Sequence, residues 1–292
     1  MSELHAGRLL QGDEAVLKAS IEQFRAQPVD QEMMAPETGG AEWRRTTLGK
    51  RVSVTGPGTF FGRAQRTLEF LPFHGRGWWF DRTDLPDSLP IGVSVLNVWT
   101  TARNIVLSSG SPHNYMRMVE HIVALKYLGV DSVMIRMDSG DPPLFERSSM
   151  DLVEAFEEAG IVSLHDVAEY RTVKEPVSIV GDRGDFLIFL PAEGDFRGLT
   201  VDCAIDFPTA IGRQRIRFDV NKPTFRHGAL ARTNTNLGMM LFCKTLGKIF
   251  ADTRNLGYTL KNILVAGPRH YVNKPQLVHN GKALEAVWHR AV

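Results

Sequence analysis

This chain has 292 residues, and its 34 lysines and arginines against 33 aspartates and glutamates leave a net charge of +1, which excludes nucleic acid as a main partner. A composition of 43% apolar and 23% charged residues excludes collagen-like and disordered classes and predicts a soluble globular protein long enough for two domains. Two cysteines without a CxxC pair exclude a disulfide framework and a four-cysteine zinc module.

Residues 1–42 are predicted to be an N-terminal extension. Leu17, Ile21 and Phe24 recur at helical spacing, which predicts a short amphipathic helix, and residues 33–40 have the composition of a linker. The chain start does not have the pattern of a signal peptide, and no apolar run approaches the roughly 18–20 residues that span a bilayer. We therefore expect a cytoplasmic protein without a transmembrane segment. Nothing in the extension carries chemistry, which favours a packing or neutral role over a functional one.

Residues 43–173 are predicted to form a first domain of strands and helices. Strands are predicted at 51–56, 91–98 and 132–137, and helices at 114–128 and 148–160, each helix ending at a glycine. Ser148 followed by Asp151 has the spacing of a capping box at the start of the second helix.

Residues 174–292 repeat that order and are predicted to form a second domain. Strands are predicted at 177–180, 185–190, 199–207, 213–219 and 262–265, and helices at 237–250 and from 282 onward. The fold class expected is α+β: two side-by-side units, each a sheet with a helix pair, in a duplicated two-layer sandwich. The functional site is expected between the units, because pockets favour domain interfaces.

Three conspicuous motifs are interpreted as structural. Residues 55–62 have glycines at the wrong spacing for a nucleotide-binding loop, and Pro57 removes a backbone N–H, so a turn between strands is predicted. Residues 78–80 (Trp-Trp-Phe) lack a basic surround and are predicted to be core or strand residues. His165 and Asp166 would point to opposite faces of an extended segment, which predicts surface positions.

The informative pair is Glu120 and His121, which lie next to each other in an otherwise apolar segment. An unpaired buried charge would cost several kcal/mol there, so something must compensate for Glu120. From the residues alone two alternatives stand equal: a hydrogen-bonded structural Glu-His pair, or a functional site.

A series of motifs around this pair resembles a known family. The motifs are Val119-Glu-His-Ile122, Leu128-Gly-Val-Asp131, Asp141-Pro-Pro-Leu-Phe-Glu-Arg-Ser-Ser149, Glu158-Ala-Gly-Ile161, Ile205-Asp-Phe207, Ile211-Gly-Arg-Gln214 with Phe218, Ala231-Arg-Thr233, Asn255-Leu-Gly257 and Trp288-His-Arg290. In this order, over residues 47–292, the chain resembles the zinc-dependent UDP-3-O-acyl-N-acetylglucosamine deacetylases of lipid A biosynthesis.

The resemblance implies a role for each of five residues. His121 and His289 would be zinc ligands, and Glu120 would be the general base that accepts a proton from zinc-bound water. Thr233 would hydrogen-bond the carbonyl under attack, and Arg290 would replace a lysine that holds substrate or the oxyanion. Zinc suits amide hydrolysis because it lowers the pKa of bound water to about 7. The implied partner is an acylated UDP-sugar, with peripheral membrane contact through its acyl chain.

The chain departs from the family pattern at several positions. The family's third zinc ligand, an aspartate, would fall at position 293, and its later catalytic histidine would follow, whereas the sequence ends at Val292. Phe60 or Phe61 replaces a histidine, Asn234 replaces a phenylalanine, and Glu146-Arg147 replace Asp-Gly. A truncated or divergent relative is therefore expected, with the second domain incomplete and with weakened zinc affinity.

Three hypotheses follow from these residues. The first is a zinc-dependent amidohydrolase acting on an acylated UDP-sugar, its site completed by a second chain, a terminal carboxylate or water. The second is a non-catalytic relative that keeps the fold as a binding or interaction protein. The third is an unrelated scaffold. Metal analysis and the effect of Glu120→Ala on hydrolysis would separate them.

Overall fold

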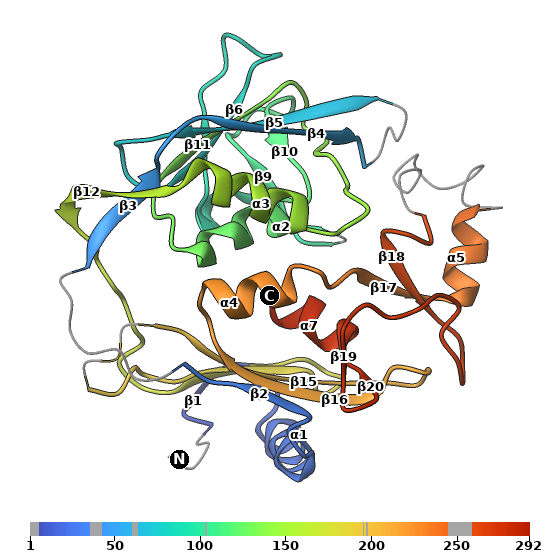
Figure 1. Ribbon diagram of the computed structural model, residues 1–292. Coiled ribbons are helices and arrows are strands. Elements are labelled where there is room, and N and C mark those ends of the chain that lie inside the picture. Colours follow the sequence, from blue (N-terminus) through green and yellow to red (C-terminus); the bar gives the residue numbers. More distant parts are fainter. Residues whose placement is uncertain are drawn as a thin grey trace.

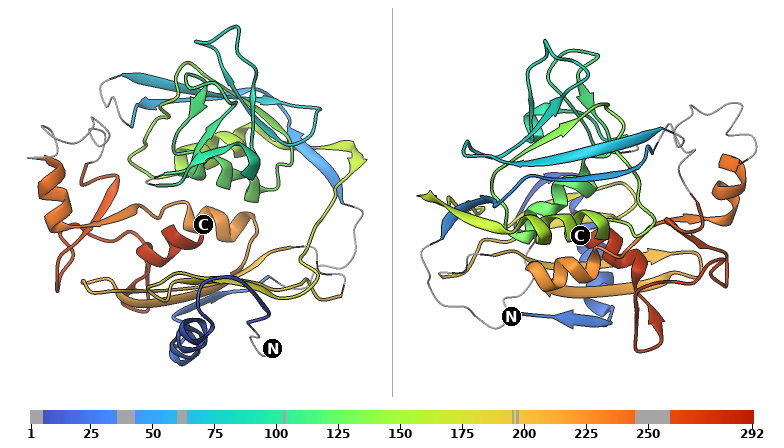
Figure 2. Two further views of the ribbon diagram at one scale, coloured as in Figure 1. Left: turned by 180° about the vertical axis from the view of Figure 1, so that it is seen from behind. Right: turned by 45° about the horizontal axis from the view of Figure 1, so that its top comes forward.

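The computed structural model describes residues 6–35, 43–59, 64–102, 104–194, 196, 198–244 and 259–292. Two halves are stacked so that sheets lie on the outside and helices lie between them (Figure 1). The turned views keep the same order of layers (Figure 2). The α+β class expected from the sequence is confirmed, while the domain boundaries at residues 42 and 173 stay a prediction.

The upper half is built on a five-stranded sheet. Its strands, in spatial order, are β4 (Val52–Pro57), β5 (Gln65–Pro72), β11 (Val133–Met137), β6 (Trp78–Arg82) and β7 (Ile91–Gly92). Helices α2 (Glu120–Val123) and α3 (Met150–Ala159) and the 3-10 helix η2 (Ala124–Leu128) cover its inner face. Phe70 and Phe80 of the sheet and Phe156 of α3 are almost completely buried, so apolar burial joins the helices to the sheet.

The helix predicted over 114–128 begins later than expected. Tyr115–Met116 form strand β10, which pairs with β9 (Val106–Ser108), and Met118 has a left-handed φ of 47°. A helix cannot pass through a left-handed residue, so α2 starts at Glu120 and continues as η2 to the predicted stop at Gly129. The apolar spacing was a correct sign of helix, but it does not mark where the helix starts.

Two further sequence predictions of the upper half are wrong. The strand predicted over 91–98 is divided into β7, the 3-10 helix η1 (Val95–Asn97) and β8 (Val98–Thr100). The predicted capping box at Ser148 does not form: α3 starts one residue later without a side-chain cap, and the Ser148 hydroxyl donates to the carbonyl oxygen of Ala231 at 2.7 Å. That bond joins the start of α3 to the lower half.

The lower half contains two three-stranded sheets. They are β15 (Thr200–Phe207), β16 (Gly212–Asp219) and β2 (Gln31–Met33), and β1 (Arg8–Gln11), β13 (Val177–Val180) and β14 (Phe186–Phe189). Helices α4 (Lys222–Gly228) and α7 (Glu285–Ala291) lie on the inner side, and α1 (Glu14–Ala26) lies on the outer side (Figure 1). The predicted hairpins 177–190 and 199–219 are confirmed.

The remaining elements lie at the rim of the molecule. They are β17 (Thr233–Asn236), α5 (Leu237–Lys244), β18 (Ile263–Ala266), the hairpin β19 (Val278–His279) with β20 (Lys282–Ala283), and the ribbon β3 (Arg44–Leu48) with β12 (Ile161–Val167). The predicted helix 237–250 is confirmed as far as Lys244, and residues 245–250 lie outside the described part, as do residues 36–40 of the predicted linker. In the described chain, no helix is both long and apolar enough to cross a membrane.

The three motifs interpreted as structural have structural roles. Trp78 and Phe80 are buried strand residues of β6. Gly58 donates its N–H to the carbonyl oxygen of Ala64, which closes the β4–β5 connection, although residues 60–63 lie outside the described part. His165 and Asp166 are exposed on β12, and Asp166 pairs with Arg45.

The halves meet through their helices. Lys222 and Arg226 of α4 pair with Glu157 of α3, and the ring of Tyr127 lies 6.3 Å from that of Phe225. Helices α2 and α7, which carry the two predicted metal ligands, lie on opposite sides of this helix layer.

Candidate metal centre

The start of α2 positions Glu120 at the surface of the helix layer. The left-handed Met118 turns the chain into the helix, and the Ile105 backbone N–H donates to Glu120 Oε2 at 3.1 Å. Glu120 is exposed to solvent, yet neighbouring protein atoms displace enough water that desolvation raises the pKa of its carboxyl. A carboxylate with a raised pKa is better suited to accept a proton.

The ring of His121 lies on the buried side of the same turn. Both of its ring nitrogens are inaccessible to water and have no hydrogen-bond partner. Burial lowers the pKa of His121 to about 4, the charge of His289 lowers it further, and the carbonyls of Met118 and Pro143 act in the opposite direction. The buried imidazole of His121 is therefore neutral, while the two alternatives of a structural Glu-His pair and a functional site stay predictions.

His289 lies on α7, in the lower half of the molecule. Burial is the main cause that lowers its pKa to about 4; Arg290 acts in the same direction, and the Ala231 carbonyl and Glu285 oppose it. The charge of His289 lowers the pKa of His121 although 168 residues separate the two histidines (289 − 121). The structure thus brings together two neutral imidazoles from the two halves of the molecule.

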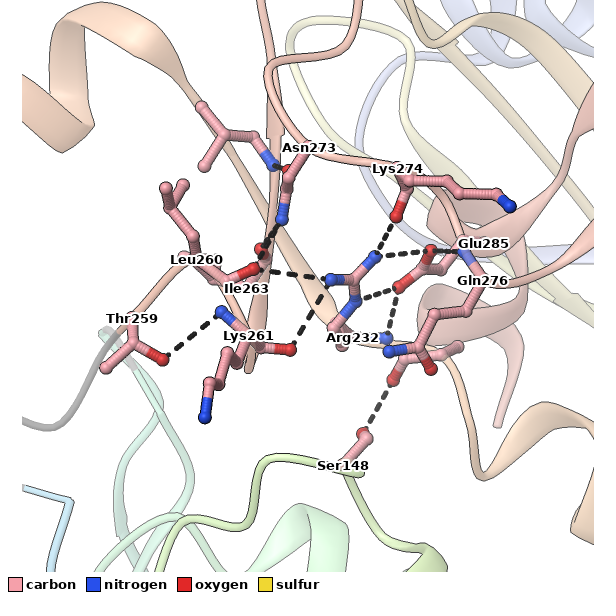
Figure 3. A network of polar contacts seen from close by, with 12 residues as sticks. Ser148, Arg232, Thr259, Leu260, Lys261, Ile263, Asn273, Lys274, Gln276 and Glu285 are labelled. Carbon is pink, nitrogen blue, oxygen red and sulfur yellow. Dashed lines mark hydrogen bonds and ion pairs between the residues drawn. The ribbon is translucent and has the colours of Figure 1, made fainter.

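A buried ion pair holds α7 against β17 (Figure 3). Arg232 Nε lies 2.6 Å from Glu285 Oε1 and its Nη2 lies 3.1 Å from Oε2. Two backbone N–H groups also donate to this carboxylate, those of Arg232 at 3.1 Å and of Gln276 at 2.6 Å, while Arg232 Nη2 donates to the carbonyl of Lys274 at 2.8 Å. Because both side chains are almost fully buried, the network satisfies charges that would otherwise be costly.

This network also positions Thr233, the next residue in the chain. Thr233 is the first residue of β17, which pairs in parallel with β18, and it is half-buried. Ala231, two residues earlier, has its carbonyl beside the His289 ring. Thr233 is therefore held near α7 by the same segment that contacts both Glu285 and His289.

Arg290 is the predicted site residue that lies most open to solvent. It is exposed at the last turn of α7, and its charge acts on His289 and on Cys203 of β15. Burial raises the pKa of the Cys203 thiol to about 11, and Arg290 opposes that shift.

The positions that depart from the expected pattern have varied outcomes. Glu146 pairs with Lys261 and Arg147 pairs with Glu154, so both form surface ion pairs. Asn234 has a buried side-chain oxygen without a partner. Phe60 and Phe61 lie outside the described residues.

Sequence reasoning missed the Arg232–Glu285 pair and the Ile105 N–H. The sequence did contain a sign of this pair, because each partner lies close to a predicted site residue. Glu285 lies one helical turn before His289, and Arg232 directly precedes Thr233. A backbone N–H has no side-chain signature, so the role of Ile105 could be found only from the structure.

The histidine pair fits a divalent metal ion such as zinc at two coordination positions. Such an ion requires neutral imidazoles; burial keeps both rings neutral, and the nitrogens of His121 have no hydrogen-bond partner. Within the described ranges no group of three or more His, Cys, Asp or Glu side chains is placed to hold a metal. The assignment of His121 and His289 as metal ligands therefore stays a prediction.

The structure is an α+β protein in which two buried, neutral histidines, His121 and His289, lie on helices of the two halves. The family model of LpxC, UDP-3-O-acyl N-acetylglycosamine deacetylase, matches residues 45–292. The chain belongs to this family.

Curated relatives agree with the family match. The chain is 28% identical over 228 residues to the UDP-3-O-acyl-N-acetylglucosamine deacetylase of Brucella ovis, covering 76% of this chain and 74% of the relative. The proteins of the same name from Brucella canis and Brucella melitensis match with the same identity and coverage. The resemblance expected from the sequence is confirmed.

Proposed function

We propose that this protein hydrolyses the N-acetyl amide of a UDP-3-O-acyl-N-acetylglucosamine, with zinc held by His121 and His289. The observation that carries the proposal is the His121 ring, whose two nitrogens are buried without a hydrogen-bond partner and whose pKa is lowered by the charge of His289. The family match and the names of the relatives supply the substrate class. The site itself supports hydrolysis because it pairs metal-ligating imidazoles with a carboxylate.

The residues of the chain divide the chemistry between them. A zinc ion, when bound, lowers the pKa of water to about 7. Glu120 accepts a proton from the attacking water, whose oxygen adds to the acetyl carbon, and then donates that proton to the nitrogen as the carbon–nitrogen bond breaks. Acetate and a free amine are the products. The raised pKa of Glu120 suits both proton transfers.

Two other residues act on charge and position. The Thr233 hydroxyl donates to the acetyl carbonyl oxygen as negative charge develops there, and β17 holds the hydroxyl in place through the Arg232–Glu285 pair. Arg290, exposed at the end of α7, provides a positive charge for the diphosphate of the substrate or for the oxyanion. The acyl chain is the part of the substrate through which contact with a membrane surface would arise.

The experiment combines metal analysis with hydrolysis. Chelator-treated protein, dialysed against zinc at neutral pH, is expected to take up one zinc ion per chain and to release acetate from the acylated UDP-sugar. Glu120→Gln should retain the metal and lose hydrolysis by about 100-fold or more, whereas His121→Ala should lose the metal. Glu22→Gln, an exposed glutamate of α1, is the matched control and should change neither quantity.

The outcomes separate the two hypotheses that the sequence left open. Absence of stoichiometric zinc in the native chain would contradict the proposal and favour a non-catalytic relative. Zinc binding with hydrolysis unaffected by Glu120→Gln would leave the metal site intact but remove Glu120 from the base role.

A further inference from the structure

The N-terminal segment 6–35 lies ahead of the family match, which starts at residue 45, and it is built into the lower half of the molecule. Strand β1 pairs in parallel with β13, and strand β2 pairs in parallel with β16. Between them, α1 packs on the outer side of the sheets, with Leu17 and Ile21 buried against Val180. The segment therefore adds one strand to each of the two lower sheets.

The connection from α1 to β2 is fixed by a single arginine. Arg215 of β16 donates through Nη1 to the carbonyl oxygens of Phe24 and Gln27 at 2.9 and 2.8 Å, and its guanidinium lies 4.0 Å from the centre of the Phe24 ring. Asp30 forms two hydrogen bonds with the backbone of Arg215. Its N–H donates to the Arg215 carbonyl oxygen, and its carboxylate accepts from the Arg215 N–H. β2 consequently has a defined register on β16.

From this position the segment reaches the helix that carries His289. The indole N–H of Trp288 donates to Gln31 Oε1 at 2.9 Å. Asp30 Oδ1 accepts from Lys282 Nζ at 2.7 Å, and Lys282 belongs to the strand that leads into α7. Trp288 is completely buried, with its ring 4.7 Å from that of Phe218 and 4.9 Å from that of His227.

The hydrogen bond to Gln31 matters because the indole N–H has no access to water. A buried donor left without an acceptor is costly, so the Trp288 ring is held in the rotation that points its nitrogen toward β2. Trp288 and His289 are neighbours on one helix, about 100° apart around its axis, so fixing one side chain against the sheet fixes the direction of the other.

We infer that the N-terminal segment is a positioning element for the metal centre: Gln31, through the Trp288 indole, holds α7, the helix that carries His289, in place. This inference rests on the proposed function, because it assigns His289 to the metal. The catalytic machinery remains Glu120 and the two histidines, and Gln31 acts only through Trp288. Groups in this outer position typically change metal affinity by about 10- to 100-fold.

The test measures the affinity of the full chain for cobalt, a zinc substitute with visible absorption bands. Gln31→Leu, which removes the acceptor, is expected to weaken cobalt binding by about 10-fold and to change the absorption spectrum of the bound ion. Gln31→Glu keeps an acceptor oxygen and should restore both. Gln23→Leu, the same change at an exposed position of α1, should leave both at the native values.

A double-mutant cycle shows whether the effect passes through Trp288. In a Trp288→Phe background the indole donor is gone, so Gln31→Leu should add no further loss of affinity. If Gln31→Leu does not give a native circular dichroism spectrum, Gln31→Met, of similar length, replaces it.

The failure of this inference can be told apart from failure of the proposed function. If the native chain binds neither zinc nor cobalt, the proposed function is wrong. If it binds cobalt and His289→Ala abolishes binding, but folded Gln31→Leu keeps the native affinity and spectrum, the positioning role is overturned while the metal centre stands. An equal loss from Gln31→Leu in the Trp288→Phe background would also overturn it.

Discussion

The two helices that carry the histidines are held in different ways. Helix α2 is short, has no side-chain cap, and is fixed mainly by apolar residues such as Ile122 that point into the upper core. Helix α7 also buries apolar residues, Val287 and Trp288, but it has in addition polar contacts with distant segments: Glu285 with Arg232 and Trp288 with Gln31.

The two kinds of contact differ in how strictly they fix the position of a helix. Apolar packing is non-directional and tolerates small rearrangements, whereas hydrogen bonds and ion pairs have fixed partners and directions. We therefore expect the geometry of the metal centre to depend more on the polar contacts of α7, and the stability of the fold to depend on both.

The largest expected loss of stability comes from breaking the ion pair between Arg232 and Glu285. Glu285→Gln leaves the Arg232 charge buried without a counter-charge, which should lower the free energy of unfolding by about 3–5 kcal/mol. Because α7 loses its contact with β17, zinc affinity should fall as well. Urea denaturation followed by intrinsic fluorescence and zinc titration measure the two quantities.

A double substitution provides the control for that experiment. Arg232→Met with Glu285→Leu removes both charges together, so its loss of stability should be smaller than that of Glu285→Gln. A double variant less stable than the single one would mean that the ion pair contributes net stability beyond the cost of an uncompensated charge.

A smaller loss of stability is expected when the apolar packing of α2 is weakened. Ile122 is completely buried, and Ile122→Ala should lower the free energy of unfolding by about 2–4 kcal/mol through lost burial and a residual cavity. The backbone at Glu120 keeps its contacts with Ile105, so zinc affinity should change by only a few-fold. The same two measurements apply, with Val123→Ala, which is only half-buried, as the control.

A zinc affinity that falls as far in Ile122→Ala as in Glu285→Gln would contradict the distinction drawn between the helices. It would mean that the packing of α2 determines the geometry of His121 as strictly as the ion pair determines that of His289.

The sequence allowed the fold class and both metal-ligand candidates to be predicted for identifiable reasons. Strands in the second half alternate and are separated by glycine turns, so the hairpins 177–190 and 199–219 could be located correctly. His121 and His289 could be proposed only through family motifs, because no local spacing rule connects residues 168 positions apart (289 − 121). Tertiary contacts alone bring them together.

The errors have equally physical causes. A helix was expected from residue 114 because the apolar spacing continues upstream, but the left-handed Met118 and the pairing of β10 with β9 override it. Residues 1–42 were expected to be neutral because they contain no reactive group. The contacts of Asp30 and Gln31 with residues more than 180 positions away carry no signal in the local sequence.

The smallest expected effect is a pH dependence of stability, and it involves a histidine that contacts α7. His227 of α4 stacks edge-on against Trp288, and desolvation lowers its pKa below the ordinary value of 6.5. As the pH falls through that ordinary value, the unfolded chain binds a proton that the folded chain resists, so stability is lost on acidification. His227→Gln should therefore show a smaller drop in urea midpoint between pH 7.5 and about pH 5.5 than the native chain. All other residues are the same in both proteins, so the difference between the two drops isolates His227; equal drops would mean that its protonation is not linked to folding.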